Sequence, residues 1–136
     1  KVKFKVIGDV TNLPISIKKT IQQAEQLTSK FNKYSLNIAY NYGGQWDITN
    51  AIETMIQDIG CFDCARLPEY LSTGTDYPDL IIRTGGYRRL SNFMLWQSAY
   101  SELVFLDILW PDFSSEELKR IVDDYKLIKR NFGKVD

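Results

Sequence analysis

The fold is decided by the stretch Asp79-Leu80-Ile81-Ile82-Arg83-Thr84-Gly85-Gly86. Residues 79–82 form a short, almost continuous apolar run, as expected for a central parallel strand that is buried on both faces. A basic residue and two glycines follow at once. Ligands of open parallel sheets bind beyond the carboxyl ends of the strands. The stretch therefore predicts a buried strand that ends in a binding loop.

Strand and helix patterns alternate before this stretch. Val2, Phe4 and Val6 alternate with lysines, as in an edge strand with one wet face. The helix before Gly60 has an apolar stripe of Ile48, Ile52, Met55, Ile56 and Ile59. We expect, in order, a strand at residues 2–6, a helix at 14–30, a strand at 34–40, a helix at 48–59 that Gly60 ends, and a short helix at 67–71.

The patterns after the stretch predict a mostly apolar helix at residues 92–103 and a buried strand at 104–109. Ser114-Ser115-Glu116-Glu117 is a capping box that opens a final helix, with Leu118, Ile121, Val122, Tyr125 and Ile128 on one face. The order β-α-β-α-(α)-β-α-β-α predicts an α/β fold with a mainly parallel central sheet flanked by helices. The turns at residues 41–44 and 83–86 both follow strands, so we expect them to line one cleft.

The composition fits one globular domain over residues 1–136, because 44% of the residues are apolar and 13% are aromatic. Seventeen basic residues balance seventeen acidic ones, so we expect no nucleic-acid partner. No apolar run reaches the roughly 20 residues that cross a bilayer, and no signal peptide opens the chain, so we expect a cytoplasmic protein. The chain starts without methionine, inside a strand pattern, and we expect it to begin in the middle of a protein.

Cys61 and Cys64 form one CxxC pair, a spacing that also occurs in redox pairs and in zinc sites. The sequence has no second pair of this kind and no histidine, so a tetrahedral zinc site would need carboxylates or a partner chain. We expect two reduced thiols, which fits a reducing cytoplasm.

Arginines cluster directly after the central strand. Three of the six arginines in the sequence, Arg83, Arg88 and Arg89, fall within seven residues. A guanidinium grips phosphate or carboxylate with two parallel hydrogen bonds, and Gly85 and Gly86 could expose backbone N–H groups before a helix start. The segment therefore predicts an oxyanion site. The alternative is a solvated loop whose arginines pair with surface acids.

The same segment resembles the signature of cis-prenyltransferases of the undecaprenyl diphosphate synthase type. The resemblance rests on residues 79–86 and 89–97 and extends to residues 99–105, Leu109-Trp110-Pro111-Asp112-Phe113, Ile7-Gly8-Asp9, Leu36-Asn37-Ile38-Ala39 and Asn41-Tyr42-Gly43-Gly44. It runs from about residue 1 to residue 133, without the variable stretch 60–78. Several long blocks in the right order make coincidence a poor explanation.

The resemblance implies an enzyme that condenses isopentenyl diphosphate with an allylic diphosphate such as farnesyl diphosphate, making a long polyprenyl diphosphate lipid carrier for the cell wall. Arg83, Arg89 and Ser91 match positions that hold the diphosphate of isopentenyl diphosphate, and Glu102 matches a carboxylate associated with Mg²⁺. The resemblance also implies a homodimer and a peripheral association with the membrane surface through the lipid product.

Other residues have weaker assignments. Asn41 and Gly43, with Gly85 and Gly86, are expected to line the cleft, although a tight turn after a strand explains Asn41 and Gly43 equally well. Trp96, Trp110 and Phe113 are expected to pack the core or the dimer contact rather than the substrate. No catalytic nucleophile is assigned within this chain.

The sequence departs from the family pattern in two ways. No Asp-Gly-Asn-Gly-Arg motif for the allylic diphosphate occurs, so we expect the N-terminal part of the fold to be missing and the fragment alone to be inactive. Tyr87 stands where the family usually has glutamate, and Asn131-Phe132-Gly133 stands where Arg-x-Gly is common.

Two further functions stay open at this point. One is a non-catalytic partner subunit or inactive truncated form of a synthase, which would have no physical need for the arginine cluster. The other is a phosphate-binding module for nucleotides, which the sequence disfavours because it has neither a P-loop nor a GxGxxG before a helix.

Overall fold

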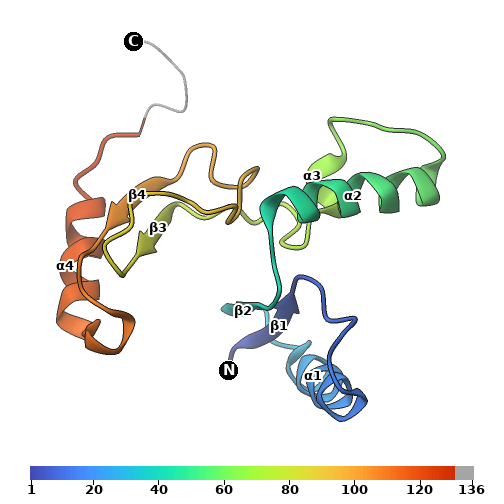
Figure 1. Cartoon of the computed structure of the whole chain (residues 1–136), viewed down its shortest axis with the longest axis horizontal. Coiled ribbons are helices and arrows are strands. Elements are labelled where there is room, and N and C mark those ends of the chain that lie inside the picture. Colours follow the sequence, from blue (N-terminus) through green and yellow to red (C-terminus); the bar gives the residue numbers. More distant parts are fainter. Residues whose placement is uncertain (131–136) are drawn as a thin grey trace. The chain divides into compact units, whose positions relative to one another are not determined.

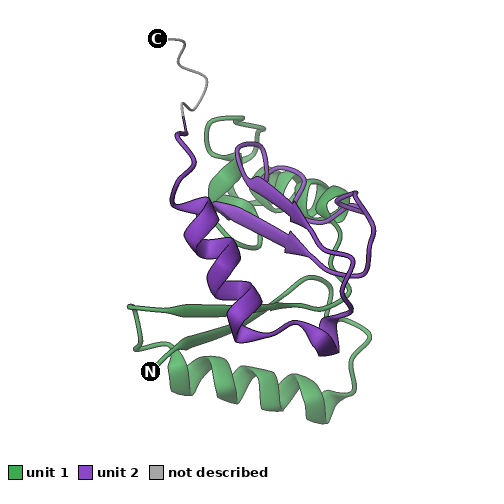
Figure 2. Cartoon of the chain, turned by 90° about the vertical axis from the view of Figure 1, so that its left-hand side faces the viewer, with its two compact units in different colours: residues 1–75 green, residues 76–136 purple. Residues whose placement is uncertain are grey.

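The computed structural model describes residues 1–130, which form two compact units, Lys1–Thr75 and a second that begins at Asp76 (Figure 2). Each unit contains one pair of parallel strands with helices (Figure 1). The elements are β1 (Lys3–Ile7), α1 (Ile15–Thr28), β2 (Ser35–Ala39), α2 (Gly44–Ile59), α3 (Leu67–Tyr70), β3 (Leu80–Arg83), β4 (Glu102–Phe105), η1 (Trp110–Asp112) and α4 (Ser115–Tyr125). The α/β class is confirmed, and the single domain over residues 1–136 stays a prediction.

The first unit opens with a β-α-β motif. Strands β1 and β2 pair in parallel, with Lys3 opposite Ser35 and Ile7 opposite Ala39, and the crossover helix α1 packs against β1 (Figure 1). Side chains of α1 accept from the free edge of β1: Thr28 Oγ1 accepts from the Phe4 N–H at 3.0 Å, and Glu25 Oε1 accepts from the Val6 N–H at 2.9 Å. The predicted edge strand is thus confirmed, with its outward N–H groups satisfied.

Helix α2 ends where the sequence predicts. Gly60 adopts the left-handed conformation, with φ of 78°, and its N–H donates to the Ile56 carbonyl. The buried stripe differs from the prediction, because α2 buries Asp47, Ala51 and Met55 while Ile56 is 46% exposed. The partner of α2 is the short helix α3, so its buried face is narrower than the isoleucine spacing suggests.

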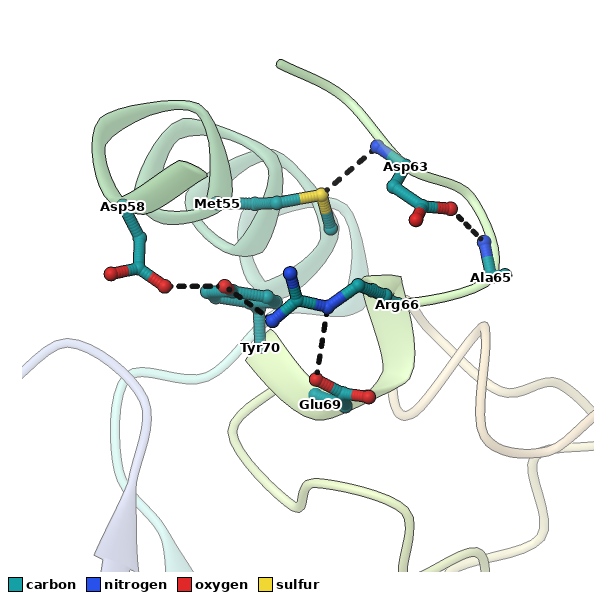
Figure 3. A network of polar contacts seen from close by, with 7 residues as sticks. All are labelled: Met55, Asp58, Asp63, Ala65, Arg66, Glu69 and Tyr70. Atoms are coloured by element: carbon teal, nitrogen blue, oxygen red, sulfur yellow. Dashed lines mark hydrogen bonds and ion pairs between the residues drawn. The ribbon is translucent and has the colours of Figure 1, made fainter. Parts of the chain in front are cut away.

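Polar contacts fix α3 to the last turns of α2 (Figure 3). The Tyr70 hydroxyl on α3 donates to Asp58 Oδ2 on α2 at 2.5 Å, and Arg66 Nη2 donates to the same hydroxyl at 3.4 Å. In the loop between the helices, the Asp63 N–H donates to the Met55 sulfur at 3.2 Å. These contacts hold the loop that carries the two cysteines.

The second unit pairs β3 and β4 in parallel, with Leu80 opposite Glu102 and Arg83 opposite Phe105. The predicted strand at residues 104–109 therefore begins two residues earlier and ends at Phe105. The predicted helix at residues 92–103 is wrong. Residues 91–100 form turns, and Ser91, Asn92 and Met94 have positive φ angles of 50°, 64° and 46°, which a right-handed helix cannot contain.

Helix α4 begins as the capping box predicts, because Ser114 Oγ accepts from the Glu117 N–H at 3.1 Å. Its predicted apolar face is only partly covered: Ile121 is 3% exposed, whereas Leu118 is 43% and Ile128 is 44% exposed. Over the residues that the structure describes, no helix is long and apolar enough to span a membrane.

Candidate anion-binding site

The three residues predicted to bind an anion meet at the carboxyl end of β3. Arg83 Nη1 donates to Ser91 Oγ at 2.8 Å, and Arg89 Nε donates to the same oxygen at 3.2 Å. Arg83 Nη1 also donates to the carbonyl of Arg89. The positive φ of Ser91 turns the chain back toward the strand, so that both guanidinium groups share one hydroxyl.

A cavity of about 290 Å³ opens beside these residues. Its charged lining is Arg83 and Arg89, and the rest of the lining is Ile81, Ile82, Leu90, Ser91, Phe93 and Phe105. The cavity thus combines a cationic end with apolar walls. This combination suits a small amphiphile that carries an anionic group on a short apolar body.

The positive charge of this site is not neutralised within residues 1–130, where neither Arg83 nor Arg89 forms an ion pair. Five N–H donors on each guanidinium leave several free after the contacts to Ser91 and Arg89 are made. The alternative reading, a loop whose arginines pair with surface acids, is therefore wrong for these two residues.

The glycines of the loop contribute shape rather than donors. The Gly85 N–H donates to the Ile108 carbonyl at 2.8 Å, and the Gly86 N–H donates to the Leu106 carbonyl at 2.9 Å. These bonds occupy the N–H groups that were expected to face an anion, and no helix begins directly after the loop in the described structure. The side chains, and not the backbone, make the anion site.

The structure does not bring Glu102 to this site. Glu102 is the first residue of β4 and lies opposite Leu80, whereas Arg83 lies at the far end of the same strand pair, opposite Phe105. The offset along the strands is roughly 10 Å, at about 3.3 Å per residue. Glu102 is half-buried and does not line the cavity. No group of three or more potential metal ligands forms among residues 1–130.

Asn41 and Gly43 lie in the first unit, where the carboxyl ends of β1 and β2 meet. The Asn41 amide donates to Asp9 Oδ2 at 3.4 Å, and Thr11 donates to Asp9 Oδ1 from its N–H at 2.8 Å and from its hydroxyl at 2.6 Å. The hydrogen bond from the Thr11 hydroxyl lowers the pKa of Asp9. Gly43 is the N-cap of α2. Asn41, with φ of 44°, lies in a bend directly after β2, which fits the turn reading for this residue. The cleft shared with residues 83–86 stays a prediction.

The sequence does not predict the role of Asp47, a residue that is only 1% exposed. Its carboxylate accepts from the Tyr42 hydroxyl at 2.9 Å and from Ser72. Asp47 lies in the first turn of α2 but directly before the predicted helix at residues 48–59, so the predicted apolar stripe did not include it.

The cysteines and tryptophans that the sequence analysis discussed lie outside the anion site. Cys61 and Cys64 are free and exposed, as expected for reduced thiols. Trp110 is 73% exposed and stacks on Phe113 at a centroid distance of 5.8 Å, so the core reading of Trp110 is wrong. Trp96 is half-buried, and its indole N–H donates to the Tyr77 hydroxyl at 3.1 Å.

A second cavity of the same unit, about 560 Å³ in volume, was not expected. Its lining includes Trp96, Tyr77 and Arg130. Arg130 donates to the Tyr100 carbonyl at 2.8 Å and to Asp79 at 2.5 Å, and both of these residues also line the cavity. The departure predicted at Asn131-Phe132-Gly133 lies outside the described residues.

Comparison with known proteins relates the chain to one family. A family model described as "Putative undecaprenyl diphosphate synthase" matches residues 1–133. The chain is 44% identical over 140 residues to the ditrans,polycis-undecaprenyl-diphosphate synthase ((2E,6E)-farnesyl-diphosphate specific) of Buchnera aphidicola subsp. Acyrthosiphon pisum, covering 97% of this chain and 56% of that protein. It is 41% identical over 142 residues to the tritrans,polycis-undecaprenyl-diphosphate synthase (geranylgeranyl-diphosphate specific) of Thermoplasma volcanium. This match covers 98% of this chain and 55% of that protein.

Solved structures agree. The crystal structure of a probable undecaprenyl diphosphate synthase from Campylobacter jejuni superposes with a TM-score of 0.88 at 32% identity, covering 98% of this chain and 64% of that one. The crystal structure of lavandulyl diphosphate synthase from Lavandula x intermedia, in complex with dimethylallyl diphosphate, superposes with a TM-score of 0.87 at 32% identity. The match covers 98% of this chain and 61% of that one. The chain spans little more than half the length of the curated relatives described above.

Proposed function

This chain belongs to the undecaprenyl diphosphate synthase family of cis-prenyltransferases, and from that premise we propose that it supplies the isopentenyl diphosphate site for cis-prenyl chain elongation. The observation that carries the proposal is the convergence of Arg83 and Arg89 on Ser91 Oγ beside an apolar cavity. The second substrate is an allylic diphosphate such as farnesyl diphosphate, and the product is a long polyprenyl diphosphate carrier lipid.

The proposed chemistry requires positioning and charge, not a nucleophilic side chain. The C–O bond of the allylic diphosphate breaks, and its electron pair leaves with the diphosphate. The double bond of isopentenyl diphosphate then forms the new C–C bond to the allylic carbon, and a proton is lost to restore a double bond in cis geometry. Arg83 and Arg89 would grip the diphosphate of isopentenyl diphosphate, Ser91 would donate its hydroxyl, and the apolar walls would orient the five-carbon body.

Magnesium belongs to the proposal through Glu102. Its half-buried carboxylate can provide one of the oxygen ligands that Mg²⁺ prefers, and one or two carboxylates suffice when substrate phosphates complete the coordination. When bound, the ion would supply charge neutralisation for a departing diphosphate. The arginine site and Glu102 are separate in the strand pair, so the arginines would bind diphosphate by themselves.

A homodimer is the proposed assembly. The segment from Phe93 to Phe113 exposes large apolar side chains, among them Trp110 at 73% and Leu109 at 61%, which a second copy would cover. Analytical ultracentrifugation of the chain at micromolar concentration should show a dimer that Trp110→Ala weakens. Leu127→Ala, which truncates an 85% exposed residue just after the C-cap of α4, is the control. A monomer in the unmodified chain would remove this part of the proposal.

The proposed site is tested by titrating isopentenyl diphosphate into the full chain by calorimetry. Arg83→Ala removes both of the contacts to Ser91 and Arg89 and should lower affinity at least about tenfold, since charge-assisted hydrogen bonds contribute about 1.5–3 kcal/mol. Arg88→Ala is the control, because Arg88 is exposed and does not line the cavity. Equal losses in both variants would refute the site and indicate a general charge effect.

A second assay separates enzyme from partner subunit. Radiolabelled isopentenyl diphosphate is incubated with the chain, farnesyl diphosphate and Mg²⁺, and label in polyprenyl product is counted. Incorporation that Arg83→Ala abolishes supports catalysis by this chain. Binding of isopentenyl diphosphate without incorporation favours the non-catalytic partner or inactive truncated form. In that case no lipid product forms, and its association with the membrane surface can be tested only with a complete synthase.

A further inference from the structure

Tyr87 lies against both arginines of the anion site. The Cζ atom of Arg89 is 4.2 Å from the centroid of the Tyr87 ring, and the Cζ atom of Arg83 is 5.6 Å from it. Tyr87 is 55% exposed, so it is not part of the core. Both distances lie within the roughly 6 Å over which a cation is attracted to an aromatic face.

The two guanidinium groups need such a contact because they carry like charges close together. Both donate to Ser91 Oγ, and no carboxylate among residues 1–130 forms an ion pair with either. An aromatic ring offers a negative face without a net charge. A carboxylate in its place would also attract the arginines, but it would cancel one of the two positive charges that an incoming anion must find.

We infer that Tyr87 is a positioning residue that holds Arg83 and Arg89 ready for a diphosphate while leaving their full charge available. This inference rests on the proposed isopentenyl diphosphate site and specifies how that site is organised before the ligand arrives. The ring fixes the guanidinium planes, and Ser91 fixes where their N–H groups converge. Tyr87 therefore tunes affinity for a multiply charged anion and takes no part in bond making.

Three variants separate the ring, the hydroxyl and the charge at this position. Tyr87→Phe keeps the ring, Tyr87→Leu removes it at similar size, and Tyr87→Glu replaces it with a carboxylate. Inorganic diphosphate is titrated calorimetrically into the full chain at low salt. Tyr87→Phe should bind as the unmodified chain does, Tyr87→Leu roughly two- to tenfold more weakly, and Tyr87→Glu more weakly still, as the strength of cation–π contacts indicates.

A readout without ligand shows whether the ring contact itself is present. The Nε–H proton of Arg89, observed by ¹H–¹⁵N NMR, should be shifted upfield by the Tyr87 ring. The shift should persist in Tyr87→Phe and disappear in Tyr87→Leu. A purely structural role for the tyrosine would alter stability but would not tie this signal to the ring.

The outcomes separate the two proposals. If the unmodified chain binds diphosphate no better than Arg83→Ala, the proposed site fails, and the positioning role falls with it. If the unmodified chain binds diphosphate and Tyr87→Leu binds it equally well, the site stands and the role of Tyr87 is refuted. If Tyr87→Phe loses as much affinity as Tyr87→Leu, the hydroxyl contacts the anion directly and the inference is also refuted.

Discussion

Ser72 donates two hydrogen bonds to one carboxylate oxygen of Asp47, from its N–H at 2.9 Å and from its hydroxyl at 2.6 Å. The residues lie 25 positions apart in the sequence, and Asp47 is at the start of α2. The Ser72 carbonyl accepts in turn from the Lys5 ammonium at 2.7 Å. One buried carboxylate thus ties the first turn of α2 to the segment that leads out of the first unit, and Lys5 extends the connection to β1.

Replacement of this carboxylate should destabilise the first unit. Asp47→Ala leaves the Ser72 and Tyr42 donors without their buried acceptor, and we expect the free energy of unfolding to fall by about 2–4 kcal/mol. Asp47→Asn keeps one acceptor oxygen and should lose less. Urea denaturation followed by circular dichroism measures both. A loss below about 0.5 kcal/mol for Asp47→Ala would show that water replaces the carboxylate and that the residue is not buried in solution.

Gly8 should not tolerate a side chain. Its φ is 102°, and a Cβ atom would lie 2.1 Å from the carbonyl oxygen of Tyr40, the residue directly after β2. We expect Gly8→Ala to cost at least about 3 kcal/mol of stability, from backbone strain and the clash together. Gly74→Ala is the matched control, because Gly74 also has positive φ but nothing lies within 4 Å of its Cβ position. It should cost only about 1–2 kcal/mol in thermal unfolding.

The elements that the sequence predicts well are those with a local physical signal. Gly60 ends α2 because it can adopt positive φ, and Ser114 begins α4 because its hydroxyl accepts a free N–H of the first turn. Residues 92–103 carry no such signal. Their apolar composition indicates contact with other residues but not a backbone conformation, and the positive φ angles of Ser91, Asn92 and Met94 break the expected helix.

The anion site shows the same limit. Arg83, Arg89 and Ser91 lie close in sequence and at the end of a strand, so their convergence could be predicted. The place of Glu102 depends on the register of β4 against β3, which no local pattern encodes. The N–H groups of Gly85 and Gly86 were misjudged for a related reason: their acceptors, the carbonyls of Ile108 and Leu106, come from a distant part of the chain.

The contact between Tyr70 and Asp58 should make stability sensitive to alkaline pH. The hydrogen bond to Asp58 raises the pKa of Tyr70 above its ordinary value of 10.0. A group with a raised pKa in the folded state stabilises the fold fully below its ordinary pKa, and this contribution is lost as the pH rises through the raised value. As the pH rises above 10, the free energy of unfolding should therefore fall more in the unmodified chain than in Tyr70→Phe.

Urea denaturation of both proteins at pH 8, 9, 10 and 11 measures this difference. The comparison between variants removes the contribution of lysines, which titrate in the same range. Tyr70→Phe should also be less stable than the unmodified chain at pH 8, where the hydrogen bond to Asp58 is intact. Parallel pH profiles would mean that the hydroxyl remains solvated and does not fix α3 to α2.

The distance between Glu102 and the arginine site predicts that metal and diphosphate binding can be separated. Glu102→Gln should leave calorimetric binding of isopentenyl diphosphate in EDTA unchanged, because Glu102 does not line the cavity beside Arg83 and Arg89. With Mg²⁺ present, any gain in affinity that depends on the Glu102 carboxylate should disappear in the variant. Asp107→Asn, which changes an exposed acid of the same unit that also does not line the cavity, is the control. Loss of affinity in EDTA would place Glu102 at the diphosphate itself, and an unchanged Mg²⁺ response would exclude it as a magnesium ligand.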